Sequence, residues 1–206
     1  MCIRDRSRTE QAHALALQLL ERYGVVTREA VNAEGVPGGY AGVYPVLKAL
    51  EERGHVRRGY FVAGLGAAQF ALPGAVDRVR SCRESGADDL QPLVLAATDP
   101  AQPYGAALTW PESPGRPARA AGAYVVLLEG QPAAYLEKGG RSLVMFPGAA
   151  DHPQWADGLA SLVGDGRRRK LEIAKIDGAP VIESDYADHL RAAGFHDGYR
   201  GLVLGR

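Results

Sequence analysis

The sequence predicts an α+β protein, and three observations support this class. Three amphipathic helical segments precede an extended hairpin within residues 8–72, an element order typical of a winged helix. Short extended segments separated by glycine-containing turns fill residues 123–146. Helical and extended segments then alternate to the C-terminus. We therefore expect a winged-helix domain, followed by an antiparallel β-rich module with two or three helices.

The helices of the first domain are predicted from their apolar spacing and their capping residues. Thr9 is expected to cap the first helix and Gly24 to end it. The Thr27 hydroxyl is placed to cap a second helix over residues 28–33. Pro45 falls inside the third helix, so its first turn is expected to be kinked or to begin late. The third helix is expected to end at Arg53 and Gly54 and to turn these side chains inward: Val43, Val46, Leu47 and Leu50.

The wing of this domain is predicted as a hairpin. Residues 56–62 favour a strand, residues 64–66 a tight turn and residues 69–72 a return strand. Pro73 ends that strand, and residues 75–84 are expected to form a connecting helix.

The rest of the chain is predicted to form a second module. We expect domain boundaries at residues 1–7 (tail), 8–84 (winged helix with connecting helix) and 85–206 (β-rich module), with residues 85–89 as a linker. Gly130-Gln131 and Gly139-Gly140 provide hairpin turns for an antiparallel meander. The strands of this meander are expected at residues 123–128, 133–137 and 142–146. The elements expected after it are a helix at 152–163, a strand at 171–176, a helix at 185–193 and a strand at 201–204.

Composition and charge limit the possible functions. The chain has 206 residues, with 24 basic and 24 acidic residues and a formal net charge of zero, so a strongly electrostatic nucleic-acid binder is disfavoured. Cys2 and Cys82 are too few for a disulfide framework or a zinc site, and the five histidines are too scattered for a metal site. No apolar run approaches the ~20 residues that cross a bilayer. We expect a cytoplasmic protein with no membrane partner and no bound metal.

The extreme N-terminus has an unusual sequence. Residues 1–6 read MCIRDR and resemble a hexapeptide found at the ends of unrelated metagenomic translations, where adapter DNA has been read as protein. We expect these residues to be non-native and the protein to continue upstream; a short disordered tail is the alternative.

Several segments resemble the C-terminal region of large helicase-related (Lhr) proteins. These segments are LLERYGVVTREAV (19–31), YPVLKALEE (44–52), RRGYFVAGLGAAQFALP (57–73), ATDPAQPYG (97–105) and the ending at residues 194–202. The resemblance covers nearly everything after residue 7. It implies an ATP-dependent DNA helicase that acts in DNA repair, with winged helices and a β-rich module at its C-terminal end. It also implies DNA (single-stranded or partly duplex) and the upstream helicase and winged-helix domains of the same chain as partners.

The motifs of an ATPase motor are missing from the sequence. It contains no phosphate-binding Gly-x-x-x-x-Gly-Lys-Ser/Thr loop and no Asp-Glu-x-His strand. By the resemblance, ATP and Mg²⁺ belong to motor domains outside this chain, and this part holds no cofactor.

Two sets of basic and aromatic residues are candidates for DNA contact. In a winged helix the third helix enters the major groove and the wing contacts the backbone. The first set is therefore Tyr40, Tyr44, Lys48, Arg53, Arg57 and Arg58. The second is the basic run Arg167, Arg168, Arg169 and Lys170, a possible phosphate clamp. The alternatives are that the unit only packs against other winged helices and that the basic run is a solvated loop.

Two further functional hypotheses are open. Winged-helix arrays also occur in a group of DNA glycosylases, which need a carboxylate and a pocket for an extruded base. Asp99, Asp185 and Asp197 are weak catalytic candidates, and Tyr104, Trp110 and Phe195 are candidates for stacking on that base. A winged-helix transcription regulator is the other hypothesis, although neither a charged wing nor a dimerisation helix is evident.

Overall fold

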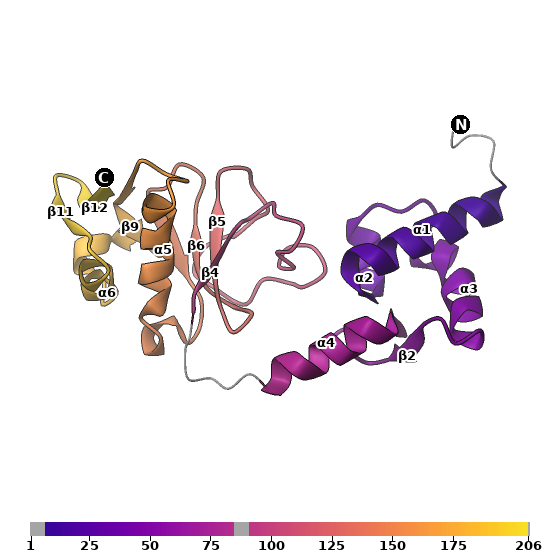
Figure 1. Cartoon of the computed structure of the whole chain (residues 1–206). Coiled ribbons are helices and arrows are strands. Elements are labelled where there is room, and N and C mark those ends of the chain that lie inside the picture. The colour runs from indigo at the N-terminus through magenta and orange to yellow at the C-terminus, as the bar shows by residue number, and fades with distance from the viewer. Residues whose placement is uncertain (1–6, 85–90, 206) are drawn as a thin grey trace. The chain divides into compact units, whose positions relative to one another are not determined.

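The structure, a computed structural model, describes residues 7–84 and 91–205. The chain forms two compact units, and apart from residues 106–108 the division falls at residues 86 and 87. Figure 1 shows helices α1 to α4 in the first unit and the larger sheet in the second. The expected linker at 85–89 and the expected non-native residues 1–6 lie outside the described residues.

The first helix begins earlier than predicted. Helix α1 (Arg8–Tyr23) is capped by Ser7, whose hydroxyl accepts a hydrogen bond from the Glu10 backbone N–H at 3.3 Å. The Glu10 carboxylate in turn accepts from the Ser7 backbone N–H at 2.9 Å, which completes a capping box. The prediction of Thr9 as the cap was wrong because the capping box satisfies two helix-end donors two residues earlier, at Ser7. Ser7, which we had placed in the tail, therefore belongs to the first unit.

The end of α1 and the start of α2 follow the predicted signals, whereas the start of α3 does not. Gly24 ends α1 with a positive φ of 67°. Thr27 caps α2 (Arg28–Ala33) by accepting a 3.0 Å hydrogen bond from the Ala30 backbone N–H. Helix α3 (Gly39–Glu52) begins before Pro45, so the late start that we considered is wrong.

The helices of the first unit enclose one apolar core. The α3 side chains of Val43, Leu47 and Leu50 are buried there, as predicted, while Val46 is only partly buried. Phe70 of the sheet and Leu20 of α1 complete the centre of this core.

A small sheet completes the winged helix. Strands β1 (Val25–Val26), β2 (Arg57–Gly59) and β3 (Gln69–Ala71) pair antiparallel in the order β1-β3-β2. Strand β2 is shorter than the predicted 56–62, because residues 60–68 leave the ladder and form the wing loop. Helix α4 (Pro73–Glu84) begins at Pro73. Proline suits this position because a backbone N–H in the first turn would have no acceptor within the helix.

The second unit is built on a six-stranded sheet. Its order is β10-β9-β7-β6-β5-β4, and all pairs are antiparallel except β7 with β9. The bounds are β4 (Leu93–Ala96), β5 (Tyr124–Leu128), β6 (Gln131–Leu136), β7 (Ser142–Met145), β9 (Lys175–Ile176) and β10 (Ala179–Pro180). The predicted meander is confirmed as β5, β6 and β7. Its first turn is Glu129-Gly130 rather than Gly130-Gln131, with positive φ at both positions, as a type I′ hairpin turn requires.

The predicted strand at 171–176 is divided between two sheets. Strand β8 (Lys170–Ile173) pairs with β12 (Gly201–Gly205), which also pairs with β11 (His196–Gly198). After Ala174 the chain continues as β9 beside β7. The Arg141 carbonyl accepts hydrogen bonds from the backbone N–H groups of Ala174 and Lys175 and so holds this crossover. Period-two alternation alone does not reveal such a change of partner.

Helices cover one face of the six-stranded sheet and an irregular segment covers the other. Helix α5 (Gln154–Gly164) follows the short helix η2 (Ala149–Asp151) and packs on β4 and β5. Helix α6 (Ala187–Ala192) packs against α5 and β12, and the short helix η3 (Val181–Glu183) packs against α6 and β12. Gly158 permits this approach, since a Cβ there would lie 2.9 Å from a methyl group of Val126. On the opposite face the Tyr135 hydroxyl donates to the Ala118 carbonyl. Among the described residues, no helix has the length and apolar character to cross a bilayer.

Candidate nucleic-acid interface

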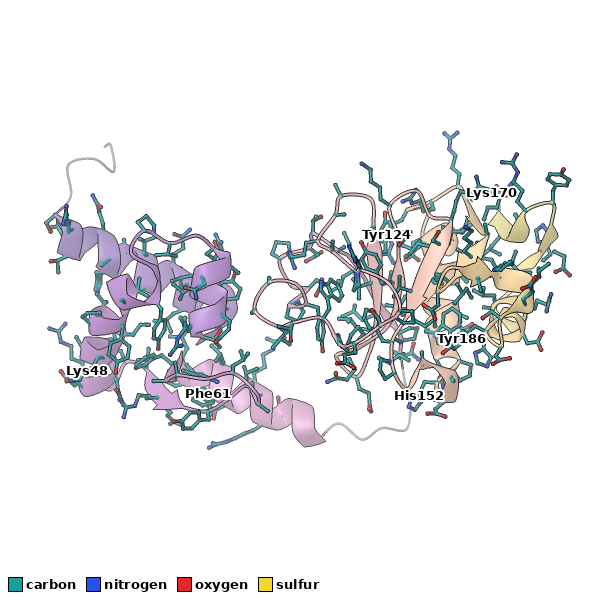
Figure 2. The ribbon with its side chains drawn as sticks, turned by 180° about the vertical axis from the view of Figure 1, so that it is seen from behind. Lys48, Phe61, Tyr124, His152, Lys170 and Tyr186 are labelled. Carbon is teal, nitrogen blue, oxygen red and sulfur yellow. The ribbon has the colours of Figure 1, made fainter. Side chains whose placement is uncertain are left out.

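The exposed face of α3 carries little that could read a base. Its outward positions are Ala41, Pro45, Lys48 and Glu52, which follow the helical period opposite the buried side chains. Lys48 points away from the first unit (Figure 2), and its ammonium lies 3.8 Å from the Glu52 carboxylate. The amide and guanidinium groups that pair with base edges in the major groove are absent from this face.

Basic residues next to α3 differ in whether they have an acidic partner. The Arg58 guanidinium lies 3.6 Å from the Glu51 carboxylate. Arg57, which precedes it in β2, and Arg53, which caps the C-terminal end of α3, are exposed and form no ion pair within the described residues. These two guanidinium groups are therefore available for a phosphate.

The wing loop is held by one buried side chain. Gln69 is fully buried, and its Oε1 accepts hydrogen bonds from the backbone N–H groups of Phe61 and Val62 at 2.8 Å each. Its Nε2 donates to the Val62 carbonyl at 3.0 Å and to the Leu65 carbonyl at 3.4 Å. Phe61 lies at the start of the loop (Figure 2). The wing is thus a fixed, uncharged loop.

An open groove lies between the first turns of α2 and α3 and the end of the wing. Its volume is about 590 Å³. The groove is lined by Arg28, Asn32, Tyr40, Ala41, Tyr44, Ala67 and Ala68. Arg28 and Asn32 were not among the predicted residues, because they belong to α2, which the general docking geometry of a winged helix does not place on the nucleic acid.

The two tyrosines of this groove form a connected aromatic wall. The ring centroids of Tyr40 and Tyr44 are 5.6 Å apart, and the Tyr44 ring meets Phe70 of β3 edge-on at 5.9 Å. The Tyr40 hydroxyl donates a hydrogen bond to the Ala68 carbonyl, which fixes the wing against α3. The Tyr44 hydroxyl makes no hydrogen bond within the described residues.

Electrostatics at the groove combine burial with nearby positive charge. Burial raises the pKa of Tyr40 to about 12, and Tyr44 and Glu29 act in the same direction. The positive charges of Arg28 and Arg58 act against this rise in pKa. Arg28 is exposed and forms no ion pair within the described residues, so it is a free cation beside an aromatic wall.

The basic run of the second unit is largely engaged in its own structure. The Arg167 guanidinium donates to the Val94 carbonyl at 2.9 Å and pairs with Asp165 at 2.9 Å. Arg168 donates to the Gly122 carbonyl at 2.8 Å, and its guanidinium lies 5.4 Å from the centroid of the Tyr124 ring.

The last two residues of the run are more open. Lys170, labelled with Tyr124 in Figure 2, lies 4.0 Å from the Glu172 carboxylate. Arg169 forms no ion pair within the described residues. A phosphate clamp made of all four residues would have to break these contacts, so Arg169 is the member best placed to bind an external anion.

The three candidate catalytic carboxylates do not converge. Asp99 accepts a hydrogen bond from the Ala101 backbone N–H at 2.8 Å and closes a local turn. Asp197 lies on β11 and pairs with Arg191 at 3.0 Å, while Asp185 is exposed before α6. None of them lines the groove beside the wing. No group of three or more His, Cys, Asp or Glu side chains there could hold a metal ion.

The aromatic residues considered for base stacking pack inside the second unit. The Trp110 ring stacks between Tyr104 at 5.8 Å and Phe146 at 5.9 Å. Phe195 is buried in the core beside α6. Tyr104 and Phe195 are buried, and the Trp110 ring already packs against other rings, so these side chains serve the packing of the second unit.

Comparison with known proteins places the chain in a family. Residues 5–91 match the family model described as large helicase-related protein, winged-helix domain. The chain is 47% identical over 210 residues to the Lhr helicase/probable uracil glycosylase of Mycolicibacterium smegmatis, covering 95% of this chain and 14% of that protein. It is 34% identical over 203 residues to the Lhr helicase/uracil glycosylase of Escherichia coli, covering 96% of this chain and 13% of that protein. The chain therefore belongs to the large helicase-related family, whose winged-helix domain forms its first unit.

Proposed function

We propose that the winged-helix unit binds DNA as an accessory module of an Lhr-type ATP-dependent helicase that acts in DNA repair. The observation that carries the proposal is a set of three exposed arginines, Arg28, Arg53 and Arg57, which lie beside α3 and the wing and have no acidic partner within the described residues. The family match supports the same conclusion. ATP and Mg²⁺ would be bound by motor domains elsewhere in a longer protein, because the phosphate-binding motifs are absent from this sequence.

The chemistry of the surface favours binding without sequence specificity. Arginine contacts to phosphates position a protein on DNA but carry no sequence information. The exposed face of α3 offers mainly small and apolar groups, and its Lys48 already has Glu52 as a partner. Such a module would hold DNA of any sequence for an upstream motor, which suits a translocating enzyme.

The test is a DNA-binding titration across salt concentrations with two matched charge variants. The variant Arg28→Gln/Arg53→Gln/Arg57→Gln removes the three unpaired arginines. The control Arg22→Gln/Arg78→Gln/Arg80→Gln removes the same charge from elsewhere in the unit. We expect the first variant to lower the slope of log K against log salt by about 2 to 3, at about 0.9 per phosphate lost on duplex DNA. Equal slopes for both variants, or no binding by the unaltered chain, would contradict the proposal.

Uracil excision is a second candidate function for a longer protein that contains this chain. It is favoured by both relatives, which are named as an Lhr helicase/probable uracil glycosylase and an Lhr helicase/uracil glycosylase and are 47% and 34% identical to this chain. Among the catalytic candidates, Asp185 is the carboxylate that forms neither an ion pair nor a side-chain hydrogen bond within the described residues, and so is the freest to activate a water molecule.

The excision test uses uracil-containing single strands and the longest available form of the protein. Abasic sites are scored for the unaltered protein and for the variants Asp99→Asn, Asp185→Asn and Asp197→Asn. We expect Asp185→Asn to lower the rate most, and unfolding curves check that each variant is folded. Unchanged rates in all three variants would exclude these carboxylates from the chemistry.

A further inference from the structure

The groove beside the wing has the composition of a site for a flat, unpaired ring. It is walled by Tyr40 and Tyr44, and its volume of about 590 Å³ lies in the range of sites that accept a small organic group. The rim is uncharged on the wing side, where Ala68 closes it. Neither the core nor the wing fills this space.

The tyrosines that form the groove differ in what holds them. Tyr40 is fixed by its hydrogen bond to the Ala68 carbonyl, so its ring is a rigid part of the wall. Tyr44 rests edge-on against Phe70, and its hydroxyl has no partner within the described residues. Because the two ring planes are tilted by 49°, they do not cover each other fully and leave ring surface open. Because both rings are already positioned by neighbouring side chains or backbone, they can stack on a base without first changing conformation.

The charge beside the groove matches a nucleic-acid backbone. Arg28 lies at the first position of α2, lines the groove and has no acidic partner among the described residues. Proteins that bind single strands combine cationic groups for the phosphates with aromatic rings for the bases. Arg28 and the two tyrosines provide both groups within one groove.

From this arrangement we propose that the groove binds single-stranded DNA, with one unpaired base stacked on Tyr44 beside Tyr40 and the adjoining phosphate on Arg28. This inference rests on the proposed DNA-binding function and adds the site, a groove on the first unit that takes one unpaired base. A base that is still paired is stacked between its neighbours and cannot offer its flat face to a side chain. The groove therefore favours strands that are already open.

The experiment compares single-strand with duplex binding for four variants of the chain. Tyr44→Phe keeps the ring, whereas Tyr44→Leu keeps apolar volume against Phe70 but removes the ring. Arg28→Gln removes the phosphate partner. Its charge control is Arg78→Gln, since Arg78 is exposed on α4 and forms no ion pair within the described residues. Quenching of a fluorescent adenine analogue within the oligonucleotide reports stacking directly.

We expect Tyr44→Leu to weaken single-strand binding by about 10-fold and to abolish the quenching, while Tyr44→Phe retains both. Duplex affinity should change less than about 2-fold in either variant. Arg28→Gln should weaken single-strand binding more than Arg78→Gln does. Thermal unfolding of each variant separates a loss of stacking from a loss of fold.

The outcomes distinguish this inference from the proposed function. Equal binding by the Leu and Phe variants, or equal losses on single strand and duplex, would overturn the stacking site and leave general DNA binding in place. If the unaltered chain binds neither form of DNA, the proposed function and this inference are both rejected.

Discussion

The side chain of Gln69 binds the backbone of Val62 twice, accepting from its N–H at 2.8 Å and donating to its carbonyl at 3.0 Å. These two hydrogen bonds take the place of the backbone–backbone hydrogen bonds that a longer wing hairpin would have formed. The wing therefore keeps its shape although it carries no charged side chain and has only short strands.

Replacing this glutamine should destabilise the first unit. Gln69→Leu leaves the backbone N–H groups of Phe61 and Val62 without their acceptor, and partly buried donors that lose a partner cost about 1–3 kcal/mol each. We expect the free energy of unfolding to fall by about 2–4 kcal/mol, measured by chemical denaturation. The exposed Gln91→Leu serves as control and should change it by less than about 0.5 kcal/mol. Coincident denaturation curves for Gln69→Leu and the unaltered chain would refute the role of this side chain.

Gly201 should tolerate no side chain. Its φ is +149°, and an added Cβ would lie 2.0 Å from the Ile173 carbonyl oxygen in the adjacent strand β8. Gly201→Ala should lower the stability of the second unit by about 2–4 kcal/mol, through overpacking and backbone strain. Gly205→Ala in the same strand is the control, because its nearest new contact would be 3.7 Å away. Thermal unfolding that ranks the two variants equally would contradict this assignment.

Tyr40 should make the first unit sensitive to alkali. Burial raises its pKa to about 12 in the folded chain, against an ordinary value of 10.0. The neutral phenol therefore stabilises the fold fully below pH 10, and this contribution is lost as the pH rises from about 10 to about 12. Titration of tyrosinate absorbance should show one tyrosine ionising near pH 12, and this step should be missing from Tyr40→Phe. Loss of a step near pH 10, instead of near pH 12, in Tyr40→Phe would show that Tyr40 ionises normally.

Neighbouring residues of the basic run should differ in their structural importance. Arg168→Gln removes the hydrogen bond to the Gly122 carbonyl and the contact with the Tyr124 ring, so we expect a loss of about 1 kcal/mol in unfolding free energy. Arg169→Gln removes the same charge without a structural contact and should be close to neutral. Denaturant unfolding of the two single variants makes the comparison. Equal stability would mean that Arg168 is as free as its neighbour.

Most helices and strands were predicted from local sequence signals, because the capping and turn residues that bound them act on neighbouring residues. The Thr27 hydroxyl caps α2 within one turn of chain, and Gly24 supplies a positive φ at the end of α1. The meander was predictable for the same reason, since hairpin turns join strands that are adjacent in sequence. The first capping residue was misassigned because Ser7 and Thr9 offer the same chemistry two residues apart.

The sequence by itself determined the winged-helix order, the meander and the candidate basic residues, since helix periodicity, turn residues and charge are properties of short segments. Only the tertiary structure decided that residues 170–176 serve two sheets and that Gln69 closes the wing. It also brought Arg28 of α2 beside the tyrosines of α3, while Asp99, Asp185 and Asp197 remained in separate surroundings. The physical reason is that such contacts join residues distant in sequence, and burial of the shared apolar core, rather than any local preference, fixes which of them meet.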